Sequence, residues 1–196
     1  MSIQIFKSAL AVSLALVFLA CSFFIPQAAP TPSAVDIEKE EQAVYSVFVS
    51  GQGTVLILRD TSTNISGDNP QQTLDYIKSG LKDISHETLD NYLERNKQPS
   101  QLSPDMDLGM EYILLSPEEL AKITSQPNWH EILREKYPNS GGYLIFSRVG
   151  FNHSLDQALI YVGQVAGPLM GAGYYYLMEK KDGEWKIKEQ IMVWIS

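Results

Sequence analysis

The sequence predicts an α+β fold in which N-terminal helices pack on a curved, C-terminal antiparallel β-meander. Up to residue 138, apolar residues recur mainly every three or four positions, which is typical of helices with one buried side. From Gly141 they alternate every two positions, as they do along strands. Helices that come first and neighbouring strands that come last indicate the α+β class. The 196 residues suffice for one packed domain, which we place at 37–196.

Helices are expected in the first part of the chain, where local signals mark their beginnings. Ser85 can cap one helix through its hydroxyl, and Ser116 followed by Glu119 forms a capping box. Asn128 and Glu131 repeat that spacing before the last helix. The helices are expected at residues 37–49, 70–81, 86–96, 116–123 and 129–138, and two strands are expected at 54–63 and 111–115.

The meander is expected after Gly141. Its strands are expected at residues 141–151, 157–164, 174–181 and 184–196. Asp182-Gly183 is a strong hairpin signal, because both residue types tolerate the positive φ that a tight turn requires. Strands joined by such short turns run antiparallel.

The stretch VGQVAGPLMGAGYYYL, residues 162–177, contains four glycines that could cradle a phosphate or allow a turn. A phosphate loop requires a helix after it, and the residues that follow are β-prone, so we predict a turn. The connection would span up to about ten residues, longer than most hairpin loops, and such loops often carry binding residues. The alternative is that its apolar tip packs into the domain's own core. The candidate ligand- or partner-binding residues are Gly163, Gly167, Leu169, Met170, Gly171, Gly173 and Tyr174.

The N-terminus predicts export from the cytoplasm. Residues 1–25 hold one lysine followed by an apolar run, and residues 26–36, rich in proline and alanine, read as a tether. Val17 to Ala20 directly before Cys21 resembles a bacterial lipoprotein signal, in which Cys21 would carry the lipid. Two alternatives remain: an uncleaved anchor, since the apolar run is near the ~18-residue lower limit for a membrane span, and ordinary secretion.

The composition and charge narrow the function classes. The formal net charge is −8, and no cluster of lysine or arginine stands out, so nucleic acid is not an expected partner. Cys21 is the only cysteine, and the helices that start at His86-Glu87 and His130-Glu131 lack a second histidine four residues after the first. We therefore expect neither a metal site nor a cofactor.

A catalytic constellation is not evident in the sequence. No serine lies in a nucleophile-elbow motif, and the domain has no cysteine. Arg148 lies within an apolar strand, so its guanidinium requires a partner: either a carboxylate such as Glu131 or Glu135 in an ion pair, or an anion bound in a cavity. The weak catalytic candidates are His130, Glu131 and Arg148.

The last part of the chain resembles a group of small exported bacterial proteins. The resemblance rests on SRVGFN (147–152), DQALIYVG (156–163), GAGYYYL (171–177), EKKDGEWKI (179–187), MVWIS (192–196) and, before them, WHEILREKYPNSGG (129–142). The group has no assigned activity, so the resemblance implies no catalytic residue. At the level of fold alone, helices followed by a curved sheet are also similar to the nuclear-transport-factor-like and cystatin-like folds.

These observations predict a membrane-tethered protein of the bacterial cell envelope that binds a partner, such as another envelope protein, or a small ligand. One alternative is an extracytoplasmic hydrolase or isomerase with a cavity around His130, Glu131 and Arg148. Another is an accessory structural subunit, and secretion remains the alternative to anchoring.

Overall fold

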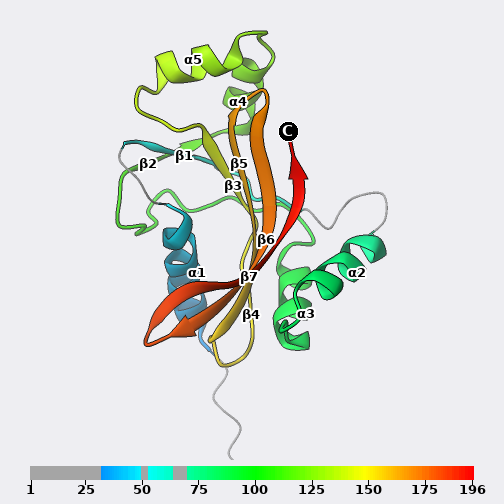
Figure 1. Cartoon of the computed structure of the whole chain (residues 1–196). Helices are drawn as coiled ribbons and strands as arrows, with labels where there is room; N and C mark the ends of the chain where they lie inside the picture. Colours follow the sequence, from blue (N-terminus) through cyan, green and yellow to red (C-terminus); the bar gives the residue numbers. More distant parts are fainter. Residues whose placement is uncertain (1–31, 50–52, 64–69) are drawn as a thin grey trace, which may run out of the picture.

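The computed structural model describes residues 32–49, 53–63 and 70–196 (Figure 1). The expected leader with Cys21, and residues 26–31 of the tether, lie outside the described residues. In the part of the chain that the structure describes, no helix is long and apolar enough to cross a membrane.

The strands form one mixed sheet, and the α+β prediction is confirmed. The 7-stranded sheet has the order β2-β1-β3-β5-β6-β7, and β4 pairs with β5 outside this path. The C-terminal strands form the predicted antiparallel meander, whereas β1 runs parallel to both β2 and β3. Helical segments connect these parallel strands, as parallel pairing requires. The strands are β1 (Val55–Leu58), β2 (Tyr112–Leu115), β3 (Tyr143–Phe146), β4 (Gly150–Phe151), β5 (Gln157–Gly167), β6 (Met170–Lys181) and β7 (Glu184–Ile195).

The helices begin at most of the predicted caps. Ser85 and Ser116 accept hydrogen bonds from backbone N–H groups in the first turns of their helices, whereas Asn128 makes no side-chain cap. The first helix begins within the expected tether, because Ser33 and Asp36 form a capping box that was not predicted. The helices are α1 (Ala34–Phe48), α2 (Pro70–Gly80), α3 (His86–Arg95), α4 (Pro117–Thr124) and α5 (Trp129–Lys136).

The helices cover both faces of the sheet. On one face, here called the α1 face, Val44 and Tyr45 of α1 pack against Phe146 and its neighbours. On the opposite face, α2 and α3 form a core with β5 and β6, and α4 and α5 form another with β1, β2 and β3. Burial of these apolar side chains is the main stabilising contribution to the fold.

Within the residues that the structure describes, the α1 face is only partly covered. Helix α1 has 15 residues and is about 22 Å long, whereas the 12 residues of β6 extend over about 40 Å. Helix α1 ends at Phe48, and the strands continue beyond it. In Figure 1, α1 begins at one end of the sheet, and the turn between β5 and β6 lies at the other end, near α4 and α5.

Candidate functional site

The glycine stretch is a tight hairpin, so the prediction of a long connecting loop was wrong. Strand β5 continues to Gly167 and β6 begins at Met170, which leaves only Pro168 and Leu169 between them. Gly163 pairs with Gly173 across the two strands. The prediction failed because glycines were read as turn residues, whereas here most of them lie inside paired strands.

Three of these glycines make room for Trp194 and Tyr161 on the face opposite α1. A Cβ on Gly173 would lie 2.2 Å from the Trp194 Nε1 and 2.6 Å from the Tyr161 hydroxyl oxygen. Gly171 lies against the same indole ring, and Gly163 against the Tyr161 hydroxyl. The indole N–H donates to the Tyr161 hydroxyl at 2.7 Å. Glycine inside a strand often marks such a close approach, so this explains Gly163 and Gly173 without a ligand.

The tip of the hairpin is exposed, and the alternative of packing into the domain's core does not hold. The exposed fractions are 83% for Leu169 and 67% for Met170. Ile195 at the end of β7 is 71% exposed. Single exposed apolar residues are ordinary, but a group of them around one depression often marks a binding surface.

These residues surround a hollow on the uncovered part of the α1 face. It has a volume of about 430 Å³ and is here called the open-face hollow. Of the predicted binding residues, Leu169, Met170, Gly171 and Tyr174 line it. None of the lining residues that the structure describes has a charged side chain. The other lining residues are Phe48, Leu144, Val162, Gln164, Ala166, Ala172, Tyr176, Ile195 and Ser196.

Aromatic rings form one wall of the open-face hollow. The Phe48 and Tyr176 rings have centroids 4.8 Å apart, and those of Tyr176 and Tyr174 are 5.7 Å apart. Burial, and after it the neighbouring Tyr174, raise the pKa of Tyr176 above its ordinary value. The Tyr176 hydroxyl is therefore neutral at physiological pH and can donate a hydrogen bond.

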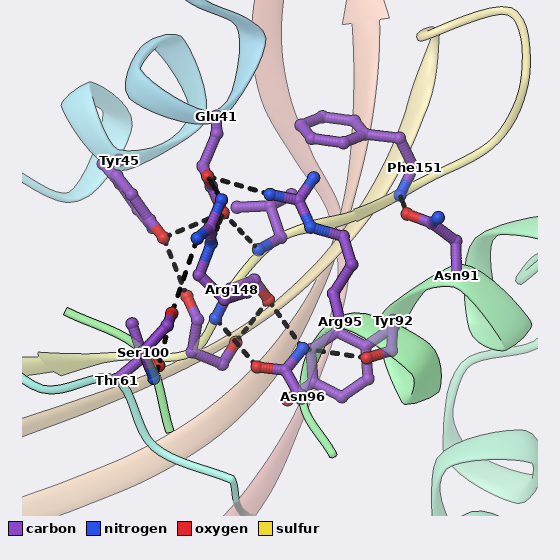
Figure 2. Close-up of polar contacts among 12 residues, drawn as sticks. Glu41, Tyr45, Thr61, Asn91, Tyr92, Arg95, Asn96, Ser100, Arg148 and Phe151 are labelled. Carbon is purple, nitrogen blue, oxygen red and sulfur yellow. Dashed lines mark hydrogen bonds and ion pairs between the residues drawn. The ribbon is translucent and has the colours of Figure 1, made fainter. Parts of the chain in front are cut away.

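The predicted carboxylate partners of Arg148 were wrong, although the ion pair itself is confirmed. Arg148 donates to Glu41 of α1, from Nε at 2.8 Å and from Nη2 at 2.6 Å, and Arg95 of α3 donates to the same carboxylate at 3.0 Å (Figure 2). The Val149 N–H and the Tyr45 hydroxyl complete the partners of Glu41. A buried carboxylate requires such partners.

The position of Glu41 was available as a sequence signal. Glu41 lies four residues after Ile37 and three and four residues before Val44 and Tyr45, on the apolar side of α1, and it is 4% exposed. The Arg148 guanidinium therefore acts in a structural pair. Its own burial lowers the pKa of Arg148, but hydrogen bonding to Glu41 and the charge of Glu41 outweigh this effect, so that the pKa is raised and the cation is retained.

Asn96 connects this ion pair to the end of α3. Its amide oxygen accepts from the Arg148 N–H at 2.8 Å, and its amide nitrogen donates to the carbonyls of Arg148 and Tyr92 (Figure 2). Asn96 is buried. The network therefore joins α1, α3 and the segment between β3 and β4, and it fixes their relative positions.

The structure does not bring His130, Glu131 and Arg148 together. His130 lies on α5 beside a second hollow of about 490 Å³, which Gly167 and the hairpin tip also line. Arg148 lies beside a different, smaller hollow together with Glu41, and Glu131 is exposed. His130 Nδ1 is buried without a hydrogen-bond partner in the described part of the chain. Among the described residues, no group of three or more histidine, cysteine, aspartate or glutamate side chains could hold a metal ion.

No family model, no curated protein and no solved structure matches the chain. The resemblance of the C-terminal block to exported bacterial proteins therefore stays a prediction, and the two named folds stay an analogy.

Proposed function

We propose that the chain is an extracytoplasmic binding module, held at a membrane of the cell envelope by its N-terminal segment, and that the open-face hollow is its binding site. The observation that carries the proposal is the concentration of exposed apolar side chains, Leu169, Met170 and Ile195, around one hollow whose described lining has no charged side chain. Hollows of about 300–1,000 Å³ with mostly apolar walls and a few polar groups are typical of small-ligand sites.

The positions of α1 and of the hairpin tip at opposite ends of the sheet support this proposal. Helix α1, which begins within the proposed tether, starts at the end of the sheet opposite the hairpin tip (Figure 1). A domain attached through this end would present the open-face hollow away from its own membrane. The hollow would then be accessible to molecules of the extracytoplasmic space.

The geometry favours binding over the hydrolase or isomerase alternative. Catalysis by a general acid or base requires the participating groups to lie within hydrogen-bond reach of one substrate. His130 and Arg148 line separate hollows, and Glu41 already occupies the Arg148 guanidinium. The open-face hollow, by contrast, has apolar side chains and a few polar groups that a ligand could contact.

Membrane attachment is tested by fractionating cells that express the full chain or its Cys21→Ala variant. We expect the wild type in the membrane fraction and the variant mislocalised or released, with Ser22→Ala as a control that behaves as the wild type. Mass spectrometry should find an acylated Cys21 at the N-terminus. An intact Met1 terminus would exclude lipid attachment, and recovery of the full chain from the soluble cytosol would overturn the proposal.

Ligand binding is tested by native mass spectrometry of the full chain purified from its own membranes in mild detergent. We expect a small molecule retained by the wild type and lost from the Leu169→Ser/Ile195→Ser variant. Val35→Ser is the matched control, because Val35 is 74% exposed and lies on α1, outside the hollow lining. Equal retention by all three proteins, or no retained molecule in any, would contradict the proposed site.

A further inference from the structure

We infer that the ligand of the open-face hollow is a neutral, planar aromatic molecule that also carries a hydrogen-bonding group. The inference rests on the proposed binding function and specifies the class of ligand. The charge of the lining, the arrangement of its rings and its free polar groups carry the three parts of this description.

The charge of the surroundings favours a neutral ligand. Among the described residues, no charged side chain lines the open-face hollow, and the whole chain has a formal net charge of −8. An anionic ligand would be repelled by the net negative charge of the protein. It would also lose its hydration in the hollow without gaining an ion pair with a cationic side chain. A cationic ligand would lose hydration, and no aspartate or glutamate side chain among the described lining residues would compensate this loss.

The ring geometry favours a planar aromatic ligand. Phe48, Tyr176 and Tyr174 form a continuous row, with interplanar angles of 53° and 41° between neighbours. Ala172 lies beside Tyr174 on the same face of β6 and presents only a methyl group. The surface is therefore lower at Ala172 than at the neighbouring aromatic side chains. A flat ring placed there can stack offset or edge-on at about 4.5–7 Å.

Met170 adds a second contact suited to a ring. It is 67% exposed and lines the open-face hollow. A methionine thioether is polarizable, and its sulfur packs favourably at the edge of an aromatic ring. Its flexible side chain can adjust to rings of different size.

Three side chains supply hydrogen bonds. The Gln164 amide and the Tyr174 and Tyr176 hydroxyls belong to residues that line the hollow. Within the described residues, no side-chain hydrogen bond engages them. The amide provides both donors and an acceptor, so a hydroxyl, carbonyl or amide on the ligand would find a partner.

Two other occupants fit the surface less well. An added β-strand would need the free edge of β7, but the Tyr76 hydroxyl of α2 donates to the Met192 carbonyl of that strand at 2.6 Å. A lipid surface would need basic side chains to attract its headgroups. The described part of the lining contains none.

A matched pair of fluorescent probes tests the ligand class. N-phenylnaphthylamine is neutral, and anilinonaphthalenesulfonate carries the same rings with an added sulfonate. Each is titrated into the detergent-solubilised full chain, the Leu169→Ser/Ile195→Ser variant and the Val35→Ser control. The signal of the double variant is subtracted, which removes the fluorescence of probe in micelles.

We expect saturable binding of the neutral probe to the wild type and the control, at least tenfold tighter than that of the sulfonated probe. Equal or tighter binding of the sulfonated probe would overturn the inferred ligand class and leave the binding function standing. Absence of a saturable difference for both probes would overturn the small-ligand site itself. Unfolding curves of the variants that match the wild type show that the loss does not come from misfolding.

Discussion

The covered and open halves of the α1 face are built on the same sheet and differ in how far their side chains are buried. In the covered half, Tyr45 stacks on Phe146 at 4.7 Å, and both side chains are fully buried. In the open half, Tyr174 is only half-buried and Ile195 is largely exposed. The open half therefore retains apolar surface that the fold does not use.

Two adjacent glutamates explain why α1 stays where it is. Glu41 binds Arg95 and Arg148, while Glu40 accepts from Lys180 at 2.6 Å and from the Trp185 indole N–H at 2.7 Å. These contacts hold α1 near the end of the sheet at which the helix begins. Because β6 is about 18 Å longer than α1 at the usual rise per residue, the far end of this face remains open among the described residues. The open-face hollow therefore exists because α1 is shorter than the strands and is held in place by these contacts.

The largest expected loss of stability comes from breaking the ion pairs of Glu41, which hold α1 on the covered half. In the Glu41→Gln variant, the two guanidinium groups lose their shared anion, and the new amide N–H₂ faces cationic donors. We expect the free energy of unfolding to fall by about 3 kcal/mol, at the lower end for a broken buried pair, because the Arg148 side chain is 30% exposed.

Urea denaturation of the two proteins measures this loss. Glu38→Gln is the control, since Glu38 lies on the same helix and is exposed. An equal loss in both variants would show that the Glu41 network does not secure α1.

A smaller loss of stability is expected from a substitution at the border between the covered and open halves. Phe48 ends α1 and is half-buried, and its ring contacts Tyr176 while lining the open-face hollow. Phe48→Ala should lower the free energy of unfolding by about 2 kcal/mol, less than for a fully buried phenylalanine. It should also weaken binding of the neutral probe, because one ring of the wall is removed. Val35→Ala on the exposed side of α1 serves as the control, and an equal loss there would contradict the border role of Phe48.

Local patterns predicted much of the fold. Caps such as Ser85 and Ser116, and the alternation after Gly141, placed the helices and the meander. The parallel pairing of β1 with β2 and β3 was not predicted, because it depends on contacts between strands that are distant in sequence. Short apolar runs carry no information about their partners or direction.

The site was predicted only in part, for two physical reasons. Leu169 and Met170 were named as parts of a long loop, and Tyr174 as the start of the strand after it. The loop was predicted because the indole of Trp194, which covers the glycines, comes from another strand. Glu41 was not named as a partner of Arg148, because charged residues on a helix are rarely fully buried. Its periodicity with Val44 and Tyr45 marked it as buried, and Arg148 required a carboxylate.

The smallest effect on stability is expected in the open half. Leu169→Ser combined with Met170→Ser removes apolar side chains that are mostly exposed in the folded chain. Since little burial is lost, the free energy of unfolding should change by no more than about 0.5 kcal/mol. Binding of the neutral probe should nevertheless fall at least tenfold, because both residues line the open-face hollow. A loss of several kcal/mol would show that these side chains belong to the core, and the contrast between the two halves would disappear.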